Sequence, residues 1–70
     1  MTAKEMFEEL GWEYNTYEAE IYYLKWSNGT FPVKNEIDFK NDKELFIDAI
    51  ITLEELKAIN KQVEELRWSD

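Results

Sequence analysis

The chain has 70 residues, of which 44% are apolar and 16% aromatic, with 16 acidic side chains against 8 basic ones. This composition excludes a disordered acidic tail, which would be poor in aromatic residues, and predicts one folded domain over residues 1–70. Because the sequence has neither Cys nor His, it offers no disulfide, no thiolate metal site and no His general base.

A short helix is predicted at the start of the chain, from Thr2 to about Leu10. Residues 2–5 read T-x-x-E, the pattern of a capping box. In this motif the Thr2 hydroxyl accepts from the Glu5 amide, and the Glu5 carboxylate accepts from the Thr2 amide. Gly11 follows directly and is suited to the left-handed conformation that ends a helix.

The middle of the chain shows the two-residue periodicity of β-strands. After the first strand, Asn28-Gly29 favours a two-residue type I′ turn, because both residue types tolerate positive φ. Asn41-Asp42 is a second candidate for a two-residue turn. The predicted strands are residues 17–26, 31–40 and 43–49.

A second helix is predicted from Leu53 to about Arg67. It begins with the same signature as the first helix, because Thr52 and Glu55 again have the capping-box spacing. Its apolar residues recur at intervals of three and four, which predicts one face buried in the core. The residues on that face are Leu53, Leu56, Ile59, Val63 and Leu66.

These elements predict an α+β fold of two layers in the order helix-β-β-β-helix. The sheet is a three-stranded antiparallel meander, and both helices pack on one of its faces. Tyr17 and Ala19 are also expected to face the helices, with Asn35 as an odd polar residue on that side. The other sheet residues expected beneath the helices are Ile21, Tyr23, Val33, Ile37, Phe39, Leu45 and Ile47.

The opposite face of the sheet is predicted to expose aromatic side chains to solvent. Five apolar residues alternate with the inward-facing ones and should therefore share this face: Ile50 and the four expected contact residues Tyr22, Leu24, Trp26 and Phe46. Large exposed apolar patches mark interaction sites, and Trp and Tyr are frequent hot-spot residues, so we expect this set to bind a partner. Alternatively, Trp26 and Phe46 pair across strands or lie beneath Trp12, Tyr14 or Trp68.

Carboxylates are numerous, but their pattern does not indicate catalysis. Two pairs could share a strand face, Glu18 with Glu20 and Glu36 with Asp38, although solvated outer positions of an amphipathic sheet explain them more simply. Four residues with side-chain oxygens lie close together in the sequence, as in a calcium-binding loop, but the Gly in the middle of such a loop is missing. A turn explains their spacing better. These residues are Asp38, Asn41, Asp42 and Glu44. Because the sequence has two glycines in total, it cannot contain the glycine-rich motifs that bind nucleotides. We therefore expect no enzymatic activity, no metal and no cofactor.

Both ends of the chain resemble a group of small uncharacterised proteins encoded by phages and prophages of Gram-positive bacteria. The matching segments are residues 2–14, TAKEMFEELGWEY, and residues 51–66, ITLEELKAINKQVEEL, not quite half of the chain. In that group the last helix commonly closes on a Gly-Trp pair, whereas Arg67 precedes Trp68 here. The resemblance implies a bacterial cytoplasmic location and a viral or mobile-element origin, but transfers no functional residue.

We therefore expect a small non-enzymatic accessory protein that binds a protein partner, or a second copy of itself, through the aromatic sheet face. A net charge of −8 argues against direct contact with nucleic acid or an anionic membrane surface. The longest apolar run, Ala49–Ile51, cannot span a bilayer, and no signal-peptide pattern begins the chain. The alternative is an acidic DNA mimic that occupies a basic nucleic-acid site through helix carboxylates: Glu8, Glu9, Glu54, Glu55, Glu64 and Glu65.

Overall fold

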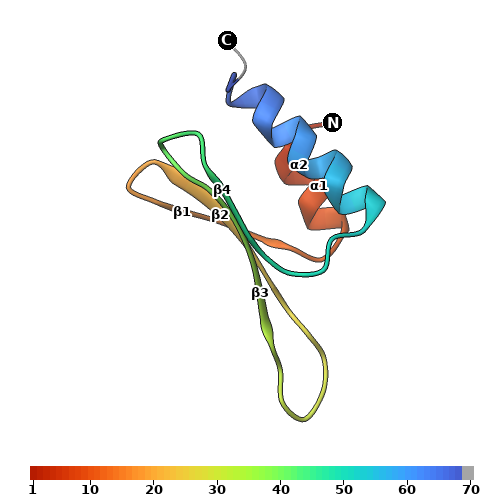
Figure 1. Ribbon diagram of the computed structural model, residues 1–70. Coiled ribbons are helices and arrows are strands. Elements are labelled where there is room, and N and C mark those ends of the chain that lie inside the picture. The colour runs from red at the N-terminus through yellow and green to blue at the C-terminus, as the bar shows by residue number, and fades with distance from the viewer. Residues whose placement is uncertain (69–70) are drawn as a thin grey trace.

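The computed structural model describes residues 1–68 and confirms an α+β fold. Four antiparallel strands form one sheet in the order β1-β2-β3-β4, and both helices lie on the same side of it (Figure 1). In chain order the elements are α1 (Ala3–Glu9), β1 (Glu13–Tyr17), β2 (Glu20–Trp26), β3 (Lys34–Phe39), β4 (Leu45–Asp48) and α2 (Leu53–Glu65).

Both predicted capping boxes are present. The Thr2 hydroxyl accepts from the Glu5 amide at the start of α1, and the Thr52 hydroxyl accepts from the Glu55 amide at the start of α2. In each case the Glu side chain accepts in return from the amide of the capping Thr. Gly11 ends the α1 segment with φ +91°. The helix boundaries therefore follow from local chemistry.

The prediction of three strands was wrong, because the residues before β2 form a fourth strand, β1. The chain reverses at Glu18 and Ala19, which have positive φ values of 48° and 68°. Neither residue type favours this conformation, so the turn carries no sequence signature. The reversal places Tyr17 opposite Glu20, on the face away from the helices, and leaves Ala19 in the turn rather than beneath α1.

The predicted tight turn at Asn28-Gly29 was also wrong. A two-residue turn there would place Tyr23 opposite Lys34, whereas the observed register pairs Tyr23 with Ile37. Because a shift by an odd number of residues reverses every side chain, the tight turn would bring charged residues of β3 beneath the helices. A seven-residue loop, 27–33, restores the apolar register.

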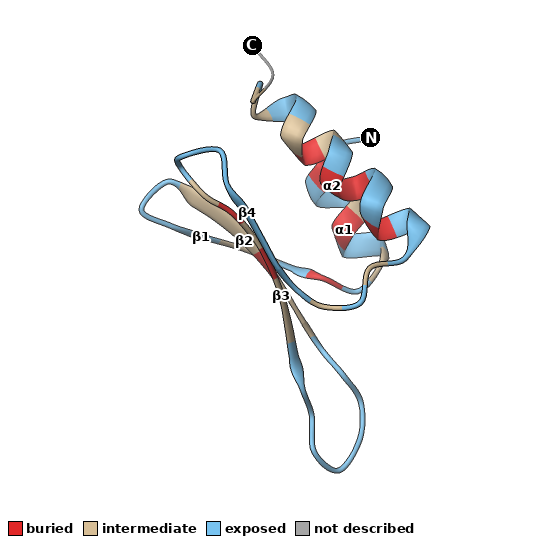
Figure 2. Ribbon diagram, viewed as in Figure 1, coloured by how far each residue is buried: buried red, intermediate tan, exposed pale blue. Residues whose placement is uncertain are grey.

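The β2–β3 hairpin extends beyond the helices as an arm (Figure 2). The amide of Ser27 donates to the Val33 carbonyl at 2.9 Å, so the ladder continues past the ends of both strands. Val33 falls on the helix side, as predicted, but no helix reaches it and it is 60% exposed. Phe31, in the loop, is 87% exposed.

The core lies where α1 and α2 cover the centre of the sheet. Phe7 stacks on Tyr23 with ring centroids 3.9 Å apart, and Phe39 meets both rings edge-on. The Tyr23 hydroxyl donates to Gln62 Oε1 of α2 at 2.6 Å. The remaining buried apolar residues of this cluster are Trp12, Ile37, Ala58 and Ile59.

Helix α2 is rotated relative to the predicted core face. Its buried residues are Glu55, Ala58, Ile59 and Gln62, while Leu53 and Leu56 are 65% and 46% exposed. The rotation places two polar side chains inward, where Trp12 and Tyr23 supply hydrogen-bond donors. The predicted inward residues of β4, Leu45 and Ile47, are 38% and 40% exposed, so the helices do not fully cover this strand.

Candidate functional site

The strand register places all four residues of the predicted binding surface on the helix-free face of the sheet. Tyr22, Leu24 and Trp26 alternate along β2, and Phe46 shares a cross-strand row with Tyr22 through Asp38. Trp26 is 56% exposed and Phe46 is 45% exposed, while Tyr22 and Leu24 are half-buried. We call this the outer face.

The alternative placements of Trp26 and Phe46 are not observed. Trp26 stands opposite Lys34, and Phe46 stands opposite Asp38, so the two rings do not pair across strands. Trp12 belongs to the core cluster on the helix side, and Tyr14 and Trp68 pack against that same cluster. None of these rings therefore covers the outer face.

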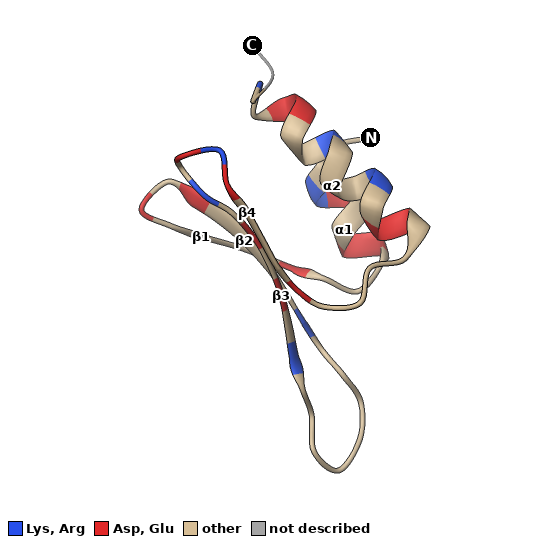
Figure 3. Ribbon diagram, in the orientation of Figure 1, with Lys and Arg blue, Asp and Glu red and all other residues tan. Residues whose placement is uncertain are grey.

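The outer face is acidic as well as aromatic. By the register and strand alternation it carries six carboxylates, on Glu13, Glu20, Glu36, Asp38, Glu44 and Asp48, against the ammonium groups of Lys34 and Lys40. Lys34 pairs with Glu36 at 3.3 Å, and Lys40 lies 3.9 Å from Asp38. Figure 3 marks the acidic residues in red and the basic residues in blue along the strands. Apolar rings within a net negative field suit a partner that is both apolar and basic.

A hollow of about 250 Å³ lies on this face. It is lined by two tyrosines and three carboxylates: Tyr17, Glu20, Tyr22, Glu36 and Asp38. Asp38 Oδ1 is buried and has no hydrogen-bond partner among the described residues. Buried polar atoms are normally bonded, so this oxygen is an unsatisfied acceptor.

The titration of the two carboxyl groups on β3 is linked. Burial and the adjacent Glu36 raise the pKa of Asp38 from its ordinary value of 3.8 to about 6. A side-chain hydrogen bond with Asp38 lowers the pKa of Glu36, so Glu36 ionises before Asp38 as the pH rises. The outer face therefore gains negative charge between about pH 4 and pH 7.

Sequence reasoning placed one residue of this hollow, Tyr17, on the wrong face of the sheet. Tyr17 was expected to face the helices, and the Glu18-Ala19 turn moved it to the outer face. The signal that was available is length, because residues 13–26 are all extended apart from that turn, and strands rarely exceed about ten residues. A stretch that long predicts a reversal even when no turn residue marks it.

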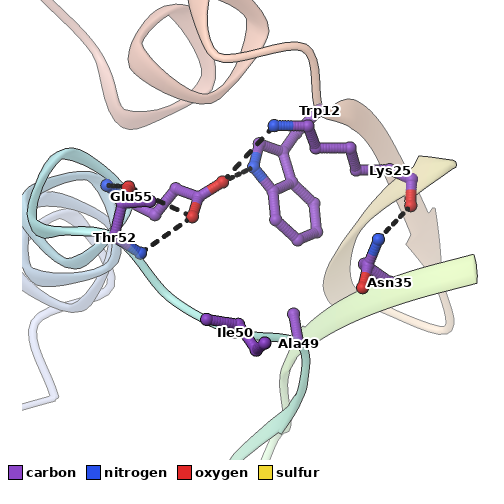
Figure 4. A pocket seen from close by; sticks show the side chains of 7 residues that line it. All are labelled: Trp12, Lys25, Asn35, Ala49, Ile50, Thr52 and Glu55. Carbon is purple, nitrogen blue, oxygen red and sulfur yellow. Dashed lines mark hydrogen bonds and ion pairs between the residues drawn. The ribbon is translucent and has the colours of Figure 1, made fainter. Parts of the chain in front are cut away.

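A second hollow, of about 300 Å³, lies on the helix side where the arm leaves the body. Figure 4 shows Trp12, Lys25 and Thr52 around the Glu55 carboxylate. Trp12 Nε1 donates to Glu55 Oε2 at 2.7 Å, the Thr52 amide donates to Oε1 at 3.0 Å, and Lys25 Nζ lies 3.6 Å from Oε2.

These contacts assign Glu55 a structural role. Burial by itself would raise the pKa of Glu55, but the hydrogen bonds from Thr52 and Trp12, together with Lys25, outweigh it and lower that pKa. A carboxylate kept ionised and fully bonded is a poor proton donor and has little capacity left for a ligand. The contacts of Glu55 in this hollow therefore hold α2 against the sheet, and its carboxylate is poorly suited to act as a reactive group.

The oxygen-bearing residues at the β3–β4 connection hold the turn. Asp42 Oδ1 accepts from the Glu44 amide at 3.2 Å, and the Asn41 amide donates to Glu20 Oε2 at 3.0 Å. Within residues 1–68 no group of three or more His, Cys, Asp or Glu side chains could hold a metal ion. No helix among the same residues is long and apolar enough to cross a membrane.

Comparison with protein-family models, with curated proteins and with solved structures finds no match for this chain. A proposal about its function therefore starts from the geometry of the outer face.

Proposed function

We propose that this is a small non-enzymatic accessory protein, of the kind encoded by phages and prophages, that binds a basic protein partner through the outer face. The observation that carries the proposal is the combination of exposed Trp26 and Phe46 with a net excess of carboxylates on one continuous surface. Burying the rings would supply affinity, and the carboxylates would select a basic partner.

The charge of the outer face favours a different protein over a second copy of this chain. If two outer faces met, six carboxylates on each would oppose six on the other, with only two ammonium groups per face. Like charges brought together in an interface oppose association. A basic partner would instead bring charge of the opposite sign to these carboxylates.

The test is a comparative capture from bacterial lysate followed by a binding measurement with the purified partner. The wild-type chain and the double variant Trp26→Ser with Phe46→Ser are immobilised in parallel. The matched control is Phe31→Ser, which removes an 87% exposed ring from the arm rather than from the outer face. We expect a basic protein to bind the wild type and the control but not the double variant.

The affinity of that partner should fall as the salt concentration rises, because screening weakens the contribution of the carboxylates. If the purified partner binds the double variant as tightly as the wild type, the outer face is not the binding surface. An affinity that does not change with salt would contradict electrostatic selection.

The alternative proposal, DNA mimicry, receives less support from the geometry. Glu55 is buried and bonded, so it cannot present charge to a partner. Glu54 and Glu64 are exposed, but they lie 3.5 Å and 3.6 Å from Lys57 and Lys61. The double variant Glu8→Gln with Glu9→Gln separates the two proposals, because only a DNA mimic would lose its partner through that change.

A further inference from the structure

Strand β4 forms an edge of the sheet, and no other strand within residues 1–68 pairs with its outer side. The other edge, β1, contacts α1, and Lys4 Nζ lies 4.8 Å from the centre of the Tyr14 ring. In contrast, all four residues of β4 are exposed, and three of them are apolar: Leu45, Phe46 and Ile47. The strand contains no proline, lysine or arginine, the residues that commonly protect an edge against pairing.

The free backbone groups of β4 belong to Leu45 and Ile47. The Lys40 amide donates to the Glu44 carbonyl at 2.9 Å, so the pair formed by residues 40 and 44 is hydrogen-bonded. Bonding alternates along an antiparallel ladder, and the amides and carbonyls of residues 45 and 47 therefore point away from β3. They are available to pair with another strand.

Apolar side chains from α2 lie toward the same edge. The Glu65 carboxylate accepts from the Ala3 amide at 2.9 Å, which places that flank of α2 against α1. Leu56 is nine positions earlier, about two and a half turns, so it lies on the opposite flank, away from α1. Leu56 is 46% exposed. Leu45 and Ile47, on the helix side of β4, are 38% and 40% exposed.

We propose that two copies of the chain pair through β4 in antiparallel orientation, with Ile47 opposite Ile47 of the second copy. The sheets would join into one of eight strands with all helices on the same side. Such a two-fold arrangement requires that residues facing each other lie on the same face, which limits the registers to those centred on a single residue.

Only one register within β4 avoids both opposing carboxylates and the β3–β4 turn. Centring on Leu45 would pair the strand with Asp42 and Lys43, which lie in the turn. Centring on Phe46 sets Glu44 against Asp48, and centring on Asp48 sets that residue against itself. Centring on Ile47 sets Phe46 against Asp48 and Leu45 against Ala49. It also makes the Ile47 pair a hydrogen-bonded one, in agreement with the free groups. This self-complementarity is what identifies a second copy as the occupant of the edge.

The first experiment is sedimentation equilibrium from micromolar to millimolar concentration. We expect a species of about twice the 8.5 kDa chain mass at the upper end. The dimer should strengthen with added salt, because each copy carries a net charge of −8 and screening reduces their repulsion. A mass that stays monomeric over this range would overturn the proposal.

The variant Ile47→Lys places a charge at the centre of the predicted pairing, and we expect it to return the mass to that of a monomer. Its matched control, Val33→Lys, makes the same type of change at another exposed β-branched residue on the helix side and should leave the dimer intact. A dimer that survives Ile47→Lys overturns the proposed surface. Far-ultraviolet circular dichroism checks that both variants are folded.

Amide hydrogen exchange of the wild-type chain tests the pairing without any substitution. The amides of Leu45 and Ile47 should exchange more slowly as concentration rises, whereas those of Tyr14 and Thr16 on the β1 edge should not change. Equal behaviour of the two edges would overturn strand pairing. Because Ile47 lies on the helix side of β4 and the outer-face residue Phe46 on the opposite side, loss of the dimer in Ile47→Lys should leave capture of the basic partner unchanged, and each proposal can fail alone.

Discussion

The two sides of the sheet differ in how they accommodate a largely buried carboxyl group. Glu55 lies on the helix side and Asp38 on the outer face. Their side chains are 6% and 18% exposed. Glu55 accepts hydrogen bonds from Thr52 and Trp12, whereas Asp38 Oδ1 accepts none within residues 1–68. On the helix side, residues of the chain itself supply hydrogen bonds to the buried carboxylate. On the outer face, burial of Asp38 beside Glu36 disfavours its charged form instead.

Replacing Glu55 should have the largest effect on stability. We expect Glu55→Gln to lower the free energy of unfolding by about 2 kcal/mol at neutral pH, because charge-assisted bonds from buried donors are lost. The folded-state pKa of Glu55 is lowered, so its contribution is present above the unfolded pKa and is lost as pH falls. Urea unfolding at several pH values should show that the difference in stability between wild type and Glu55→Gln becomes smaller in acid. Glu54→Gln, which changes an exposed neighbour, should have little effect.

Replacing Asp38 should act in the opposite direction. We expect Asp38→Asn to stabilise the chain by about 1–2 kcal/mol at pH 7, because the buried carboxylate no longer has to ionise. The pKa of Asp38 is raised from 3.8 to about 6, so its cost is absent below about pH 4 and grows as pH rises to 6. Urea unfolding should give the same stability for variant and wild type in acid. A destabilised variant at pH 7 would contradict the raised pKa.

Asp48→Asn is the matched control for this substitution, since it removes the same charge from an exposed position on β4. If both substitutions stabilise the chain equally, the gain reflects net charge rather than the buried position of Asp38.

Removing one hydroxyl group from each side of the sheet should lower stability by different amounts on the two sides. Tyr23→Phe removes the donor to Gln62 Oε1 and should cost about 1 kcal/mol, because it leaves a buried acceptor without a partner. Tyr22→Phe removes a hydroxyl from the outer face and should change stability by only a few tenths of a kcal/mol. Thermal unfolding of the pair measures the difference, and equal losses would contradict the comparison.

The smallest expected change in stability follows Trp26→Ser. Trp26 is 56% exposed on the outer face, so the free energy of unfolding should change by about 0.5 kcal/mol or less. Calorimetry with the purified basic partner should nevertheless show weaker binding. A large loss of stability would mean that the exposed ring supports the fold instead of a partner.

Local chemistry predicted the helices well but not the face that α2 buries. The capping boxes at Thr2 and Thr52 depend on residues three positions apart, and both formed as expected. The orientation of α2 depends instead on Trp12 and Tyr23, distant in sequence, whose donors require Glu55 and Gln62 inside. Apolar periodicity contains no information about such pairings.

The sheet shows the same division between local and distant causes. Alternation correctly assigned Tyr22, Leu24, Trp26 and Phe46 to one face. Turn residues were misleading, because Asn28-Gly29 lies in a seven-residue loop while Glu18-Ala19 makes the tight reversal. In both hairpins the register that buries Tyr23 and Ile37 outweighed the preferences of the turn residues.

The joining of α1 to α2 has a consequence for how the chain folds during synthesis. The Ala3 amide donates to Glu65, and Trp12 and Tyr23 donate to Glu55 and Gln62, so each of these donors pairs with a residue synthesised at least 39 positions later. The meander emerges from the ribosome first and stays incomplete until α2 clears the exit tunnel. Chaperones that hold nascent chains would therefore meet this protein as a sheet whose helix side is still uncovered.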